Sequence, residues 1–188
     1  MNLMGEVFAL WLPILVSAVV VFFASFLVWM VLPHHRADVR RLPDEERKLD
    51  TIRSWNLPPG LYMWPQPENP AEMKSEAFAE RCRKGPWGVL SIRPGMPNLG
   101  MNLGLVFLFY VIVSTFVAYL TRLAHGPGTP YLEVFQVAGA VAVLGYCAGG
   151  IPYAIFFGKP LRFVVTELID GIVYGLLTAG VFAWLWPR

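Results

Sequence analysis

The last apolar stretch of the chain, residues 161–188, reads LRFVVTELIDGIVYGLLTAGVFAWLWPR. It is long enough to cross a bilayer, because a helix of about 20 apolar residues spans the hydrocarbon core. Two acids, Glu167 and Asp170, lie inside one end, and small residues recur every fourth position at Gly171, Gly175 and Ala179. A helix that faced only lipid would need neither feature. The stretch therefore predicts a membrane helix that packs closely against a neighbour and carries buried charge.

Composition assigns the whole chain to the class of multi-span membrane proteins. Hydrophobic residues make up 56% of the 188 positions and charged residues 15%, and 20 of the charged residues fall between positions 36 and 93. The rest of the sequence contains four apolar runs, each long enough to span a bilayer. We predict an all-α integral membrane protein with transmembrane helices at residues 8–32, 101–123, 133–157 and 163–186.

Lys and Arg are distributed unevenly between the two sides of these spans. Thirteen of the 15 fall in the segments 33–100 and 158–162, whereas the other side holds only Arg122 and Arg188. Basic residues next to spans favour the cytoplasmic side, so we expect both termini outside and the large loop in the cytoplasm. The first run lacks the basic start and small-residue cleavage site of a signal peptide and is expected to be a retained anchor.

The large loop, residues 33–100, predicts a small cytoplasmic α+β insertion between the first two spans. Helices are expected near residues 43–55 and 70–83, because each begins with proline and acids that favour a first helical turn. Short strands are expected near residues 61–65 and 87–92, where they could pair antiparallel. Two strands alone are marginally stable, so the insertion is expected to lean on the membrane surface or on the span ends.

The third and fourth spans are predicted to form a tight antiparallel hairpin, because their connection at residues 158–160 is short. Small residues form one strip on each of these helices, and such strips let backbones approach closely. Folding the sequence about residue 160 places Gly145 opposite Gly175 and Tyr153 opposite Glu167. The predicted packing residues are Ala138, Ala142, Gly145, Gly149, Gly171, Gly175 and Ala179.

Asp170 is the centre of a candidate polar or ion site that also includes Glu167, Tyr153 and Tyr174. Two interpretations are open. In the first, a nearby basic residue neutralises Glu167, and Asp170 bonds to Tyr153 or to backbone that glycines free in the third span. In the second, Asp170 is a protonatable or cation-binding group in a polar pocket, since acids within hydrocarbon are costly and often functional.

No catalytic residue, cofactor or metal ligand is predicted. The neighbouring His34 and His35 are interpreted as an interfacial, partly solvated pair, because adjacent side chains diverge on a regular element and no further His or Cys stands at ligand spacing. Cys82 and Cys147 are not expected to form a disulfide. The sequence contains no phosphate-binding loop and no metalloprotease motif. A net charge of +2 gives no reason to expect nucleic acid as a partner.

Three segments resemble small, uncharacterised four-span membrane proteins of bacteria, of the domain-of-unknown-function type. They are NLPPGLYMWP at residues 56–65, GPWGVL at residues 85–90 and DGIVYGLLTAGVFAWLWP at residues 170–187. Such families have no assigned activity. The resemblance therefore implies a bacterial inner-membrane location and supplies no functional residues.

The sequence favours a non-enzymatic structural or accessory subunit that acts through helix packing or its cytoplasmic insertion. The alternative is a small oligomeric transporter, or an ion or proton conductor, that uses Asp170 and Glu167. An enzyme acting on lipid is the third possibility. The expected partners are the bilayer and either further copies of the chain or a larger membrane complex. A cavity lined by both acids would favour transport, whereas capping of Asp170 by tyrosine or backbone would favour the accessory role.

Overall fold

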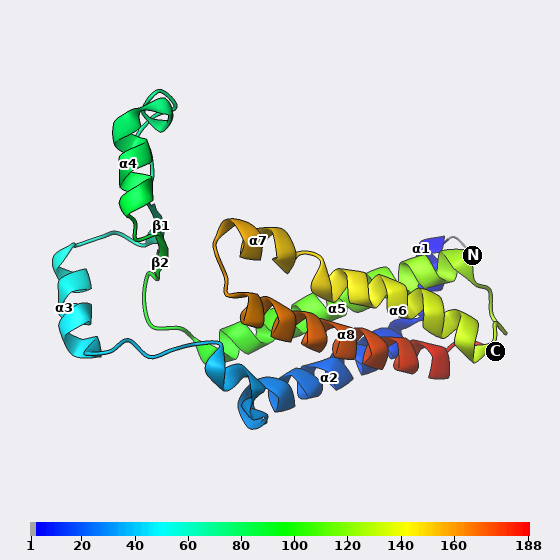
Figure 1. Ribbon diagram of the computed structural model, residues 1–188. Helices are drawn as coiled ribbons and strands as arrows, with labels where there is room; N and C mark the ends of the chain where they lie inside the picture. Colours follow the sequence, from blue (N-terminus) through cyan, green and yellow to red (C-terminus); the bar gives the residue numbers. More distant parts are fainter. Residues whose placement is uncertain (1–2) are drawn as a thin grey trace. The chain divides into compact units, whose positions relative to one another are not determined.

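The computed structural model describes residues 3–188 and divides into two units. One unit is a helix bundle made of the chain up to Val39 together with Asn98–Arg188, and the other is the insertion Arg40–Pro97. Among the described residues, four helical segments are long and apolar enough to cross a membrane (Figure 1). They are Trp11–Val31, Leu99–Ala124, Tyr131–Phe156 and Leu161–Trp184. The prediction of a mainly helical chain with four such segments is confirmed.

The first span is assembled from several short elements. A short helix, α1 (Leu3–Ala9), precedes α2 (Trp11–Phe26), and a π-helical turn, η1 (Leu27–Val31), continues α2. The Leu32 N–H then donates to the carbonyl of Leu27, which closes a wide turn at 2.9 Å. Leu32 itself is extended, and Pro33 begins a 3₁₀ helix, η2 (Pro33–Ala37). This change of backbone geometry lets the residues after the span turn back toward the bundle, and π turns of this kind often occur at functional sites.

The second span is one continuous helix, α5 (Leu99–Ala124), which begins where the Asn98 side chain accepts a hydrogen bond from the Met101 N–H at 3.0 Å. Asparagine is a favoured residue at this position because its oxygen satisfies a backbone donor that has no helical partner. Inside the bundle, Ser17 of α2 donates to Ser114 of α5 at 2.9 Å. Ser25 and Thr115 bond to backbone carbonyls of their own helices, as is usual for hydroxyls in membrane helices, whereas the buried Thr121 hydroxyl has no hydrogen-bond partner among the described residues.

The third span is broken, whereas the fourth is continuous. Helix α6 (Tyr131–Cys147) ends at a turn around Gly149, and a short helix, α7 (Gly150–Phe156), follows (Figure 1). Helix α8 (Leu161–Trp184) starts after Pro160 and runs to the end of the bundle. The break coincides with the glycine pair and Pro152, because proline removes a backbone donor and glycine destabilises a helix interior.

The contact between α6 and α8 is close, but its register differs from the prediction. A Cβ added at Gly175 would lie 2.4 Å from Val143 Cγ2, and one at Gly171 would lie 2.6 Å from Cys147 Sγ. The hairpin is therefore centred near residue 159 instead of 160. Since a shift of two positions turns a helix face by roughly 200°, Val143 lies over Gly175, and Gly145 faces Val113 of α5 instead.

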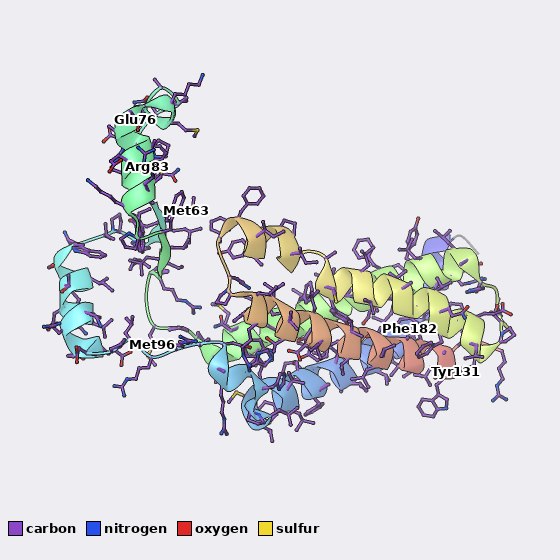
Figure 2. The ribbon with its side chains drawn as sticks, viewed as in Figure 1. Met63, Glu76, Arg83, Met96, Tyr131 and Phe182 are labelled. Atoms are coloured by element: carbon purple, nitrogen blue, oxygen red, sulfur yellow. The ribbon has the colours of Figure 1, made fainter. Side chains whose placement is uncertain are left out.

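Apart from Gly145, the predicted packing residues divide into a buried group and one exposed residue. Ala138, Ala142 and Ala179 are fully buried, and Gly171 and Gly175 are buried with them. Gly149 is exposed, and a Cβ there would meet nothing within 4 Å. Its predicted packing role is wrong, because the chain leaves the α6 axis at this residue. Around the contact, the bundle core contains Val117, Val134, Ala138, Ala179 and Phe182, and Figure 2 shows Phe182 on α8 near the start of α6 at Tyr131.

The insertion contains the predicted two-stranded sheet. Strand β1 (Gly60–Trp64) pairs antiparallel with β2 (Gly88–Ile92), with Tyr62 opposite Leu90. Helix α3 (Glu45–Ser54) precedes the sheet, and η3 (Glu72–Lys74) and α4 (Glu76–Lys84) connect its strands. The helix expected at residues 70–83 is interrupted at Ser75, which is extended and whose side chain accepts from the Phe78 N–H and so begins α4.

No residue of Arg40–Pro97 is fully buried, although the segment contains several large apolar side chains. Trp87, for example, is 67% exposed and lies just before β2, where its Nε1–H donates to the Cys82 carbonyl at 3.0 Å. On the surface of α4, Arg83 pairs with Glu76 and Glu80 (Figure 2). Exposed pairs of this kind contribute little to stability. Because no residue of Arg40–Pro97 is buried, the insertion has no substantial core of its own.

Candidate functional site

Both histidines that follow the first span lie on the 3₁₀ helix η2 and reach the same carboxylate. His34 Nε2 is 3.2 Å from Asp170 Oδ1, and His35 Nε2 is 2.7 Å from Asp170 Oδ2. Asp170 is on α8 and is only 5% exposed. The expectation that the two rings would diverge is wrong, because the tight turn of η2 brings their centroids to 4.3 Å from each other. Three side chains from opposite ends of the sequence therefore meet at one point.

A second carboxylate lies behind His35. Asp38 Oδ2 is 2.8 Å from His35 Nδ1, and the Asp38 side chain has no exposed surface. Thr166 Oγ1 donates to Asp38 Oδ2 at 2.8 Å, and Arg162 Nε donates to Asp38 Oδ1 at 3.0 Å. The other end of this guanidinium donates to the His34 carbonyl at 2.8 Å. Helix α8 thus fixes both η2 and the carboxylate that orients His35.

The surroundings of Asp38 keep it ionised. Burial alone would raise the pKa of this carboxyl, but the hydrogen bonds from Thr166, His35 and Arg162, together with the positive charge of Arg162, outweigh burial and hold the pKa below the ordinary value of 3.8. Near neutral pH Asp38 is therefore a carboxylate, which accepts hydrogen bonds from its neighbours and donates none.

His35 has a carboxylate oxygen at each of its ring nitrogens. A neutral imidazole carries a single N–H and can donate to only one of them. In a neutral ring, only one of these two contacts can therefore be a hydrogen bond that His35 donates. Trp29 of the π turn stacks on the ring of His35, with centroids 3.8 Å apart and planes 7° from parallel. The ring is held from its face as well as from both nitrogens.

Asp170 also lines a cavity of about 270 Å³, together with residues of η1, α5, α6, α7 and α8. Glu167 also lines this cavity, and its carboxylate pairs with Lys159 Nζ at 3.1 Å. Five of the other twelve residues that line the cavity are aromatic: Trp29, Phe109, Tyr110, Tyr146 and Tyr174. The Tyr174 hydroxyl is buried and has no hydrogen-bond partner among the described residues. Both predicted acids therefore line one cavity, with Tyr174 beside them.

Tyr153 is not part of this site. It lies on α7, is 47% exposed and stacks on Phe157 at 4.3 Å, with Lys159 Nζ 5.8 Å from its ring centroid. The break after α6 explains the difference, because it turns α7 away from the register that placed Tyr153 opposite Glu167. Of the four predicted site residues, the structure brings together Asp170, Glu167 and Tyr174.

Comparison with protein-family models, with curated protein sequences and with solved structures finds no match to this chain.

The residues that sequence reasoning missed are His34, His35 and Asp38. Their spacing, H-H-x-x-D at positions 34–38 immediately after a proline that ends a span, was the available signal. This spacing becomes informative only once helix α8 is known to pack beside the segment. There, Asp170 contacts His35, and Thr166 and Arg162 donate hydrogen bonds to Asp38.

Proposed function

We propose that the protein is a small membrane transporter of cations, with Asp170 as the charge that the ion meets inside the bundle. The observation that supports this most is that buried Asp170 lies between a cluster of histidines and a cavity whose wall also contains Glu167. Acids within a membrane bundle often mark an ion pathway. Neither a tyrosine nor backbone caps Asp170 among the contacts of the described residues, as the accessory role would have favoured.

The broken third span is consistent with this proposal. Gly150 and Ile151 of α7 line the cavity that contains Asp170. In membrane transporters, helices interrupted near the middle of the bilayer leave backbone groups that can line a site for an ion. Four spans enclose little volume, so we propose that the transporting form contains more than one copy. The accessory role expected from the sequence stays a prediction.

Uptake into proteoliposomes tests the proposal. Vesicles that contain the protein are incubated in a mixture of alkali, alkaline-earth and first-row transition-metal ions, and their contents are measured by elemental analysis. We expect at least one ion to accumulate above the level of protein-free vesicles. Asp170→Asn should reduce this accumulation to background, whereas Glu167→Gln, which removes an acid of the same cavity, should retain a substantial part. Equal uptake by Asp170→Asn and the unmodified protein would refute the role proposed for Asp170.

We further propose that the insertion Arg40–Pro97 lies in the cytoplasm and both termini outside, in the inner membrane of a bacterium. The chain provides its own probe, because Cys82 is in the insertion and the one other cysteine, Cys147, is in α6. In a Cys147→Ser variant, a membrane-impermeant maleimide should label inverted vesicles and leave intact spheroplasts unlabelled. Cys82→Ser in the same background is the control for specificity. Labelling of intact spheroplasts would reverse the orientation.

A further inference from the structure

We infer that His34, His35 and Asp170 bind a divalent first-row transition-metal ion, such as Zn²⁺. The identity of the transported ion rests on the transport function proposed above. The binding site itself is supported by separate contacts. His34 Nε2, His35 Nε2 and an Asp170 carboxylate oxygen all lie within 4.8 Å of one another. Imidazole nitrogen and carboxylate oxygen are ordinary ligands of such ions.

The distances between these three groups can be compared with the ligand separations of a tetrahedral zinc site. Zinc binds nitrogen and oxygen ligands at about 2.0–2.1 Å, so tetrahedral ligands stand about 3.3 Å from one another. His34 Nε2 is 3.2 Å from Asp170 Oδ1 and His35 Nε2 is 2.7 Å from Asp170 Oδ2, whereas the three ligand atoms as a set lie within 4.8 Å of one another. An ion would therefore require side-chain movements that bring both Nε2 atoms and one carboxylate oxygen to the ligand spacing. Three protein ligands also leave one tetrahedral position for water, which is the arrangement of a site that exchanges its ligand or its ion.

The groups behind the ligands favour a metal over a simple ion pair. A histidine that binds a metal through one nitrogen usually donates its other N–H to a carboxylate, which fixes the tautomer and the orientation of the ring. Asp38 Oδ2 is placed to accept that hydrogen bond from His35 Nδ1 at 2.8 Å, and Thr166 and Arg162 hold Asp38. With Nδ1 as the donor, the lone pair of Nε2 points toward Asp170 and His34.

The presence of a second imidazole supports the same conclusion. One histidine between two carboxylates would be enough for an ion pair, yet His34 Nε2 approaches the carboxylate that His35 already contacts. The three ligands also differ in access, since the side chain of His34 is 32% exposed, whereas His35 and Asp170 are 6% and 7% exposed. His34 therefore lies where an ion could enter, and the two buried ligands hold it from within.

Metal binding by the full chain in detergent is the test, with a purification tag that contains no histidine. After treatment with a chelator, the protein is titrated with Co²⁺, whose visible absorption reports the ligand field, and Zn²⁺ is then added as a competitor. We expect one ion per chain and displacement of Co²⁺ by Zn²⁺. His34→Ala, His35→Ala and Asp170→Asn should each weaken binding by about 100-fold or more, because removal of a ligand exceeds the usual effect of an outer partner.

The matched control is His125→Ala, since His125 is the third histidine of the chain and lies at the end of α5, where its backbone N–H donates to the Thr121 carbonyl. It should bind Co²⁺ as the unmodified protein does. Equal loss in His125→Ala, or unchanged affinity in His35→Ala, would overturn the site. If Asp170→Asn fails to fold, the Co²⁺ affinity of His34→Ala decides the outcome, because the His34 side chain is partly exposed.

Binding and transport can fail separately. Absence of Co²⁺ and Zn²⁺ binding, combined with uptake of another cation that depends on Asp170, would overturn the metal site and leave the transport proposal standing. Stoichiometric binding without uptake of any ion would overturn transport and support the metal site.

Discussion

Replacing Gly175 with alanine should lower the stability of the bundle by about 1–3 kcal/mol, the usual effect of forcing one extra carbon into a packed contact. The added Cβ would lie 2.4 Å from Val143 Cγ2, 2.9 Å from Val143 N and 3.1 Å from Val143 Cα. Two of these atoms belong to the backbone of α6 and cannot move without displacing the helix. Since van der Waals packing drives association of membrane helices, the separation of α6 from α8 has no compensating gain.

The measurement is the midpoint temperature of thermal unfolding in detergent. Unfolding is monitored as the loss of the monodisperse peak in size-exclusion chromatography. For a chain of this size, each kcal/mol corresponds to a change of about 2–4 °C in the midpoint. Gly104→Ala is the matched control, because Gly104 also lies within a helix apolar enough to cross a membrane, α5, and a Cβ there would meet nothing within 4 Å. If both variants unfold at the same temperature, the close contact of α6 and α8 does not determine stability.

Asp38→Asn should weaken the affinity for Co²⁺ and Zn²⁺ by about 10–100-fold, the range typical for loss of a group that orients a metal ligand. Asparagine keeps the size of the side chain but loses the charge that accepts the His35 Nδ1–H and pairs with Arg162. The three metal ligands stay in place. The Co²⁺ spectrum at saturation should therefore keep its general form, whereas the concentration needed for saturation rises.

Two variants separate this positioning role from general damage. Asp38→Glu restores the carboxylate and should recover part of the affinity, which a purely structural defect would not predict. Glu167→Gln removes an acid that lines the neighbouring cavity and pairs with Lys159, without a contact to either histidine among the described residues. It should leave Co²⁺ affinity nearly unchanged. Equal affinities of Asp38→Asn and the unmodified protein would exclude Asp38 from the site.

The helices and strands were accessible from sequence because their causes are local. The four apolar runs have the length and hydropathy of spans, and the antiparallel strands of the insertion lie within a few residues of their predicted bounds. Local causes also account for the interruption of the third span, since Gly149, Gly150 and Pro152 were visible as helix-weakening residues.

The helix register and the candidate site depend on contacts between residues far apart in the sequence, which local sequence patterns do not specify. A change of one residue at the centre of a hairpin alters which side chains face each other, so Gly145 could not be assigned to α5 from the pattern of small residues alone. The cluster around Asp170 joins residues more than 130 positions apart in the sequence. Its formation depends on a π turn at the end of the first span and a 3₁₀ helix just after it, and neither has a clear sequence signal.

The hydrogen bonds of Asp38 have a consequence for how this chain can change over evolutionary time. Asp38 is attached to α8 just before the insertion begins, and Asn98 caps α5 just after it ends. Both ends of the insertion are thus fixed by residues of the bundle itself. Segments joined at such anchored points can be lengthened, shortened or exchanged without disturbing the structure that holds them. The insertion is therefore the part of this protein that we expect to vary in length and sequence among descendants that keep the same bundle.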